Sequence, residues 1–127
     1  MKRVSLVISI FALAALGLQA QDKTYFVSPH GSDSADGLSV RNAWKSIDKV
    51  NAATFQAGDK VLFEGGATFY GNLVIKSSGT PEKPIVFSGY GEGRPVINMG
   101  KKEGSAITIL NADGLEVRGF EITSGYA

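Results

Sequence analysis

The chain has 127 residues, of which 43% are hydrophobic and 20% are charged, and it contains no cysteine. These values exclude a disordered tail, a disulfide scaffold and an enzyme with a catalytic thiol. The net charge is only +1 at pH 7, so we expect no binding to nucleic acid, which requires a concentration of basic side chains. Glycine occurs 16 times without a three-residue period, which excludes collagen and indicates many tight turns between short strands.

The first twenty residues have the pattern of a secretory signal peptide. Met1–Arg3 is basic, Val4–Leu18 is an apolar run, and Ala20 is the small residue expected before a cleavage site. An N-terminal membrane anchor is the alternative interpretation. Since no later segment approaches the roughly 20 apolar residues of a transmembrane helix, we expect a mature chain without a membrane span. It would be secreted, periplasmic or attached to the cell surface.

A strand and one helix are predicted in the first part of the mature chain. Residues 24–28 are β-branched and aromatic and stop at Pro29, and the turn-rich residues 31–37 follow as a loop. A helix is expected from a cap at Ser39 or Asn42 to about Ala53. The apolar stripe that predicts this helix consists of Ala43, Trp44, Ile47 and Val50.

Beyond Gly58, short strands recur at a regular spacing. One set is predicted at residues 61–63, 85–87 and 107–109, and a second at residues 73–75, 96–97 and 115–117. Strands that recur every 20 to 25 residues are typical of stacked coils, with glycine at the corners. A sandwich of hairpins with similar spacing is the alternative.

Several motifs together resemble the N-terminal region of secreted right-handed parallel β-helix proteins of the pectate-lyase-like kind. They are Tyr25–Ser39, Ala43–Ile47, Ala57–Phe63, Ser77–Phe87 and Leu115–Ile122. The resemblance implies an all-β fold, namely a right-handed parallel β-helix with an N-terminal strand and a capping α-helix across the mouth of the first coil. The corresponding divisions are a signal peptide at 1–20, the strand, loop and helix at 21–57, and the first coils at 58–127.

Members of this family usually continue for many more coils and carry their catalytic residues on central ones. We therefore expect this chain to be the N-terminal part of a longer protein, and a genuine small protein is the alternative. Residues 120–122 would then form an edge strand, available to further coils or to a second copy of the chain.

The predicted outward columns provide few candidates for catalysis. The columns Leu62, Val86, Thr108 and Glu64, Ser88, Leu110 lack the paired carboxylates that a glycosidase requires. Outward residues near the second set of strands include Lys76, Glu116 and Arg118. Lys76 and Arg118 are candidate substrate contacts, because a uronate lyase needs a cation near the sugar carboxylate and a base. Their alternative role is that of solvated strand residues.

Asp33 and Asp36 are the candidate metal ligands, because hard cations such as calcium prefer carboxylate oxygens. Their spacing does not fit an EF-hand loop, and Asx-turns within their own loop are the alternative role. No cofactor is evident for this chain, although calcium could bind a longer parent protein. His30 is the only histidine, which argues against a multi-histidine zinc site and a Ser-His-Asp triad.

The function predicted from these observations is that of an exported carbohydrate-active enzyme acting on polysaccharide. A polysaccharide lyase acting on an acidic polymer is the first hypothesis and a glycoside hydrolase the second, with catalytic residues beyond residue 127 and no activity in this chain alone. A non-catalytic β-helix module that binds glycans or presents a surface is the alternative. Tyr70, Tyr90 and Tyr126 could stack on sugar rings or cover the ends of the core.

Overall fold

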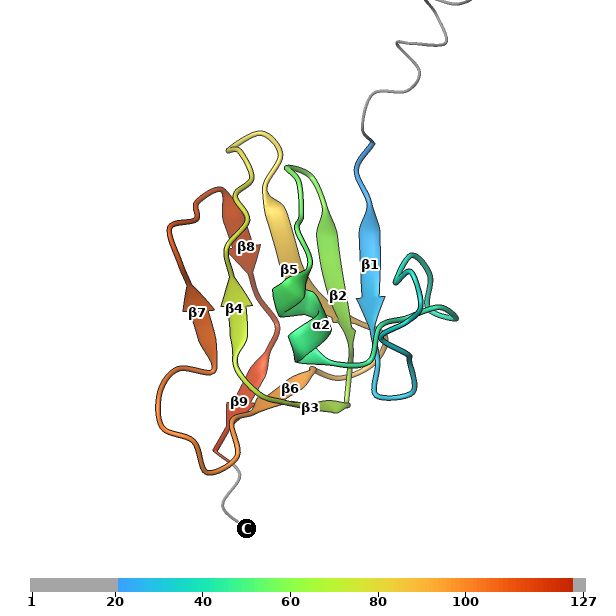
Figure 1. Ribbon diagram of the computed structural model, residues 1–127, viewed down its shortest axis with the longest axis vertical. Helices are drawn as coiled ribbons and strands as arrows, with labels where there is room; N and C mark the ends of the chain where they lie inside the picture. The colour runs from blue at the N-terminus through green and yellow to red at the C-terminus, as the bar shows by residue number, and fades with distance from the viewer. Residues whose placement is uncertain (1–20, 125–127) are drawn as a thin grey trace, which may run out of the picture.

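The computed structural model describes residues 21–124 and shows short strands wound around one core, with a single short helix at one side (Figure 1). The predicted signal peptide and Tyr126 lie outside the described residues. Within residues 21–124, no helix has the length and apolar character needed to cross a membrane.

The strands form three parallel sheets. Sheet A contains β1 (Thr24–Val27), β2 (Lys60–Glu64), β5 (Ile85–Tyr90) and β8 (Leu115–Val117), in that order. Sheet B contains β3 (Thr68–Tyr70), β6 (Val96–Asn98) and β9 (Glu121–Thr123), and sheet C contains β4 (Leu73–Ile75) and β7 (Ile107–Ile109). The helix α2 spans Ile47–Ala52.

The chain passes through the three sheets in turn and thereby forms stacked coils. One coil is β2–β3–β4, the next is β5–β6–β7, and β8–β9 begins a third. Each strand pairs in parallel with the equivalent strand of the next coil, as in a parallel β-helix, whereas hairpins would give antiparallel pairs. The predicted parallel β-helix is therefore confirmed, and the sandwich alternative is wrong.

The predicted assignment of strands to columns is wrong. Residues 107–109 pair with residues 73–75 rather than with 85–87, and residues 115–117 pair with 85–87. The reason lies in the corners: only two residues separate β3 from β4, whereas eight separate β6 from β7. Because the coils differ in corner length, matching strands by spacing alone placed them in the wrong sheets.

The predicted outward columns change accordingly. Leu62 lies beside Ser88, Glu64 lies beside Tyr90, and Thr108 lies beside Val74. The middle strand of each coil belongs to sheet B, which was not predicted as a separate set: β3 was missed, and the residues of β6 were assigned to the second set. Residues 120–122, predicted as an edge strand, largely coincide with β9 at the edge of sheet B.

The core is a stack of inward side chains from successive coils. Val61 lies beside Phe87, and Phe69 lies beside Ile97, with all four side chains buried. Phe63 meets the ring of Phe69 edge-on, at 5.0 Å between ring centroids. Such edge-to-face contacts add to the stabilisation that burial provides.

The helix is shorter than predicted and begins at Ile47 rather than near residue 40. Ser46 is its N-cap, with extended backbone, and the Ser46 hydroxyl accepts a hydrogen bond from the Lys49 N–H at 3.1 Å. Trp44 is instead in a parallel bridge with Val27: its N–H donates to the Phe26 carbonyl at 2.9 Å. Ala43 and Trp44 are thus buried because this segment pairs with β1, and not because they lie on the apolar face of a helix.

The helix α2 closes the first coil at sheet C. Ile47 and Val50 are buried beneath it, and the Asn51 side chain completes the closure by donating to the Asn72 carbonyl and accepting from the Val74 N–H, each at 2.8 Å. Asn51 thus satisfies backbone groups at the free edge of β4. Since β1 pairs with β2 in the same way, sheets A and C are covered at this end, as the predicted capping role requires. Among the described strands, none pairs with the outer edge of β3.

Candidate functional site

A hollow on the described surface lies at the uncovered edge of β3. It has a volume of about 520 Å³ and is bounded by β3, by the start of α2 and by the loop after β1. Its lining residues are Pro29, Asp33, Lys45, Ser46, Ile47, Asp48, Thr68, Phe69 and Tyr70. The hollow thus combines an aromatic wall with carboxylates, an amine and hydroxyls, which are groups that can bind a polar ligand with an apolar face.

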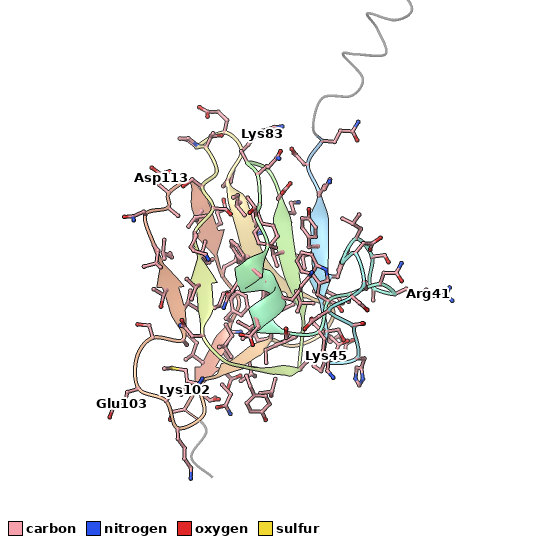
Figure 2. All side chains as sticks on the ribbon, in the orientation of Figure 1. Arg41, Lys45, Lys83, Lys102, Glu103 and Asp113 are labelled. Atoms are coloured by element: carbon pink, nitrogen blue, oxygen red, sulfur yellow. The ribbon has the colours of Figure 1, made fainter. Side chains whose placement is uncertain are left out.

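Tyr70 stands between this hollow and a second one. It is the last residue of β3, and 72% of its surface is exposed. The second hollow has a volume of about 270 Å³ and is lined by Tyr70, Gly71, Asn98, Met99, Gly100, Lys101 and Lys102. Lys45 and Lys102, on the walls of the first and second hollow respectively, lie at the same end of the molecule as β3 (Figure 2).

Asp33 holds the wall of the first hollow in place. Its carboxylate accepts from the N–H groups of Lys45 and Ser46, at 2.8 and 2.9 Å, and from the Ser46 hydroxyl at 2.6 Å. Partial burial raises the pKa of Asp33, but these hydrogen bonds and the charge of Lys49 outweigh burial and leave the pKa below its ordinary value. Asp33 is therefore held in its ionised form and has no proton to donate, so that it is unsuited to act as a general acid.

The two predicted metal ligands have different local roles. Asp36 accepts from the N–H of Leu38 at 2.9 Å, which confirms the Asx-turn expected within its own loop. That expectation is wrong for Asp33, whose partners lie 12 and 13 residues further along the chain. Within residues 21–124, no group of three or more histidine or acidic side chains is gathered as a metal site would require. Calcium binding by either aspartate stays a prediction.

The structure does not bring Lys76 and Arg118 together. Lys76 directly follows β4 of sheet C, whereas Arg118 directly follows β8 of sheet A, and both are exposed. The Arg118 guanidinium lies 2.9 Å from the carboxylate of Glu116, which is in β8. Substrate contact by either residue stays a prediction, but they cannot serve one sugar as neighbours on one sheet.

Tyr90 and Glu64 form a separate polar group on the outer face of sheet A. Ser28, which is buried, donates to the Glu64 carboxylate at 3.2 Å. The Tyr90 ring packs edge-on against Phe26 at 5.4 Å. Burial raises the pKa of Tyr90, and the nearby charge of Glu64 raises it further. Tyr90 is therefore partly buried against Phe26 on the outer face of the sheet rather than over an end of the core, whereas Tyr70 is exposed.

Sequence reasoning missed the hollow beside β3. The segment Thr68–Tyr70 is too short to be predicted as a strand from its pattern. Lys101 and Lys102 belong to no motif that would predict a binding role. A signal was present in Tyr70, which follows a buried aromatic residue and precedes Gly71. Alternation within a strand sends such neighbours to opposite faces, so that a buried Phe69 requires an outward Tyr70.

Solved structures of two carbohydrate-active enzymes are similar to this chain. For the GH136 lacto-N-biosidase from Eubacterium ramulus, the TM-score is 0.75 and the identity 28%, over 83% of this chain and 22% of that enzyme. For a rhamnogalacturonan lyase, the TM-score is 0.63 and the identity 24%, over 79% of this chain and 28% of the lyase. This chain therefore spans less than a third of the length of either enzyme. The scan of family models and the search of curated proteins gave no match.

Proposed function

We propose that this chain is the N-terminal portion of an exported carbohydrate-active enzyme with a parallel β-helix fold. The observation that supports this most is the similarity to lacto-N-biosidase, which combines 28% identity with a TM-score of 0.75. The signal-peptide pattern of residues 1–20 supports export. The partner is a polysaccharide or oligosaccharide in this proposal.

Glycoside hydrolysis is the better supported reaction. The lyase, our first hypothesis from sequence, is supported by a match at 24% identity, which indicates a common fold and carries no argument about the reaction. A hydrolase needs a carboxyl group that protonates the leaving oxygen and a second carboxylate across the sugar ring. Asp33 and Asp48 both line the larger hollow, but the lowered pKa of Asp33 opposes the acid role. We therefore propose that the catalytic pair lies on further coils.

In this proposal, residues 21–124 form the first coils of the solenoid and the cap that covers its N-terminal end. The strand β1 and the helix α2 cover the first coil, so that later coils are laid down on a fixed register. This contribution needs no chemistry from Lys76 or Arg118. We expect residues 21–127 alone to be inactive.

The first experiment is an intact-mass measurement of the natural secreted protein. A mature chain of residues 21–127 would weigh about 11 kDa, and a much larger mass is expected. The full protein is then assayed with a chromogenic lacto-N-bioside and with acidic polysaccharides, where unsaturated uronate is followed by its ultraviolet absorbance. Release of the chromophore supports the hydrolase, whereas formation of unsaturated uronate without chromophore release would support the lyase hypothesis instead.

A non-catalytic glycan-binding module is the second candidate function. It is favoured by the exposed Tyr70 between two hollows, a feature that serves binding without catalysis. A natural protein near 11 kDa that binds glycans and cleaves none of them would establish this function and contradict the enzyme.

A further inference from the structure

We propose that Tyr70 is the stacking platform of a glycan-binding site at the capped end of the β-helix, and that this site takes an oligosaccharide with an anionic group on one sugar. The inference deepens the proposed function and rests on it, since it assumes that the protein handles carbohydrate. The site comprises the two hollows on either side of the Tyr70 ring, and it uses Lys101 and Lys102 as the anion-binding side chains.

The ring of Tyr70 faces solvent rather than the core. Tyr70 is 72% exposed, although the neighbouring Phe69 is 3% exposed and packs in the core. Tyr25 and Tyr90, by contrast, pack against other aromatic rings. An outward tyrosine provides a rigid apolar face with a polar tip, which suits the apolar face and hydroxyl rim of a sugar ring.

The surface next to the ring is hollowed in two places. The hollows of about 520 and 270 Å³ both include Tyr70 in their walls, so that a chain crossing the ring enters a depression on each side. A single sugar would use only one of them. This geometry fits an oligosaccharide of several units.

The charged side chains that line the smaller hollow are all basic. The charged residues that line the smaller hollow are Lys101 and Lys102, with no carboxylate among its lining residues. Neither lysine takes part in the ion pairs formed by residues 21–124. Two amines facing one hollow favour a carboxylate or sulfate group, and this attraction is sensitive to salt. The amide of Asn98 lies in the same wall.

The wall of the larger hollow is held in place by hydrogen bonds. Lys45 and Ser46 are held by three hydrogen bonds from their N–H and hydroxyl groups to Asp33. The larger hollow is therefore bounded by a fixed backbone, which lowers the entropic cost of ordering a bound ligand. The Asp48 carboxylate in this wall is available to accept hydrogen bonds from sugar hydroxyl groups.

The site is tested with the full secreted protein by affinity electrophoresis in gels containing polygalacturonate or a neutral galactan. We expect retardation by polygalacturonate to exceed that by galactan and to weaken with added salt. Tyr70→Ala should lower the affinity by about tenfold, since it removes the ring face on which a bound sugar would stack. Tyr70→Phe should keep the affinity within about twofold, because it retains the aromatic face.

Two further variants isolate the parts of the site. Lys101→Gln combined with Lys102→Gln should remove the preference for polygalacturonate and the salt dependence. Val40→Ala is the matched control, since Val40 is an exposed apolar side chain, at 56%, that lines neither hollow. Circular dichroism melting curves establish that every variant is folded.

Several outcomes would overturn the inference. Unchanged affinity in Tyr70→Ala contradicts the stacking platform, and equal retardation by the two polymers contradicts the anionic ligand. Tyr70-dependent binding to deglycosylated mucin polypeptide, without binding to either polymer, would assign the site to a peptide. If the wild type cleaves a glycan but Tyr70→Ala binds normally, only the inference fails; if it neither binds nor cleaves any carbohydrate, the proposed function fails as well.

Discussion

At the scale of single residues, Asp33 shows how one side chain positions a wall of the candidate site. Its carboxylate gathers two backbone N–H groups and one hydroxyl from the segment that leads into α2. The same contacts explain why the helix starts late. Because residues 45 and 46 bond to Asp33, they do not take part in an earlier helical turn.

Removal of this carboxylate should destabilise the fold. We expect Asp33→Ala to lower the free energy of unfolding by about 1–2 kcal/mol, as loss of a capping side chain does. Asp36→Ala removes one hydrogen bond, to Leu38, and should cost less. Urea denaturation followed by tryptophan fluorescence measures both. Equal losses in the two variants would show that Asp33 has no special role.

The lowered pKa of Asp33 predicts a pH dependence of stability. An unfolded aspartate titrates near pH 4, and in the folded protein the pKa lies lower. The ionised form therefore stabilises the fold above about pH 4, and this contribution is lost as the pH falls through the folded-state pKa. Thermal melts between about pH 2.5 and 6 should fall more steeply in the wild type than in Asp33→Asn. Parallel curves would contradict this linkage.

At the scale of elements, the cap and the corners determine how the coils fit together. The helix α2 acts through two buried side chains, Ile47 and Val50, and through the Asn51 side chain. A corner contact between coils joins Gly79 to residue 113, where the Gly79 N–H donates to the Asp113 carbonyl at 3.0 Å.

Truncation of the helix at its buried face should loosen the first coil. We expect Ile47→Ala to lower the free energy of unfolding by about 2–5 kcal/mol, because it leaves a cavity under the cap. Ala52 lies on the exposed side of the same helix, and Ala52→Ser should change the free energy of unfolding by less than about 0.5 kcal/mol. Chemical denaturation of both variants tests this, and a small effect of Ile47→Ala would mean that the helix is not part of the cooperative fold.

Glycine at the corner is required for space as well as for backbone conformation. A Cβ on Gly114 would lie 2.5 Å from the Gly79 carbonyl oxygen, whereas a Cβ on Gly91 would meet nothing within 4 Å. Both glycines have positive φ, 64° and 75°, so that both alanine variants carry the same backbone strain of about 1 kcal/mol. We expect Gly114→Ala to cost about 1–3 kcal/mol more. Equal melting temperatures for the two variants would contradict close packing of the corners.

The sequence was sufficient to predict the kind of fold but not its register. Strand periods near 23 residues indicated coils, because short apolar runs that recur at this spacing with glycine between them are typical of stacked repeats. They could not assign strands to sheets, since the long corner at residues 99–106 shifts β7 relative to β4. The helix was overextended because Trp44 is buried by strand pairing with Val27. The hollow at Tyr70 depends on which edge the cap leaves uncovered, a tertiary property that no local pattern encodes.

At the scale of the whole molecule, the two ends of the stack formed by residues 21–124 differ. At one end, β1 and α2 cover the first coil. At the other, inward columns end in exposed side chains: Ile109 continues the column of Ile75 and is 49% exposed, and Ile122 continues that of Ile97 and is 54% exposed. These side chains and the adjacent unpaired strand edges form an apolar surface that favours association with another chain.

The polypeptide 21–127 should therefore self-associate when prepared alone. We expect a mass above that of a monomer in light scattering coupled to size-exclusion chromatography, with the fraction of oligomer rising with concentration. Ile109→Lys combined with Ile122→Lys should yield monomer, because the charges oppose apolar pairing. Val40→Lys, an equally exposed apolar position elsewhere, should still associate. Monomer in all three preparations would contradict self-association through the surface that contains Ile109 and Ile122.

The closed first coil also gives the solenoid a direction of growth. A repeat structure without end caps can nucleate anywhere and extend both ways. Here the outer edges of β2 and β4 are covered and only that of β3 is open, so that a complete coil can add on the other side only. If the chain is exported N-terminus first, the cap emerges before the coils that it organises. Each new coil then meets a completed template, and unpaired strands are exposed at a single advancing face.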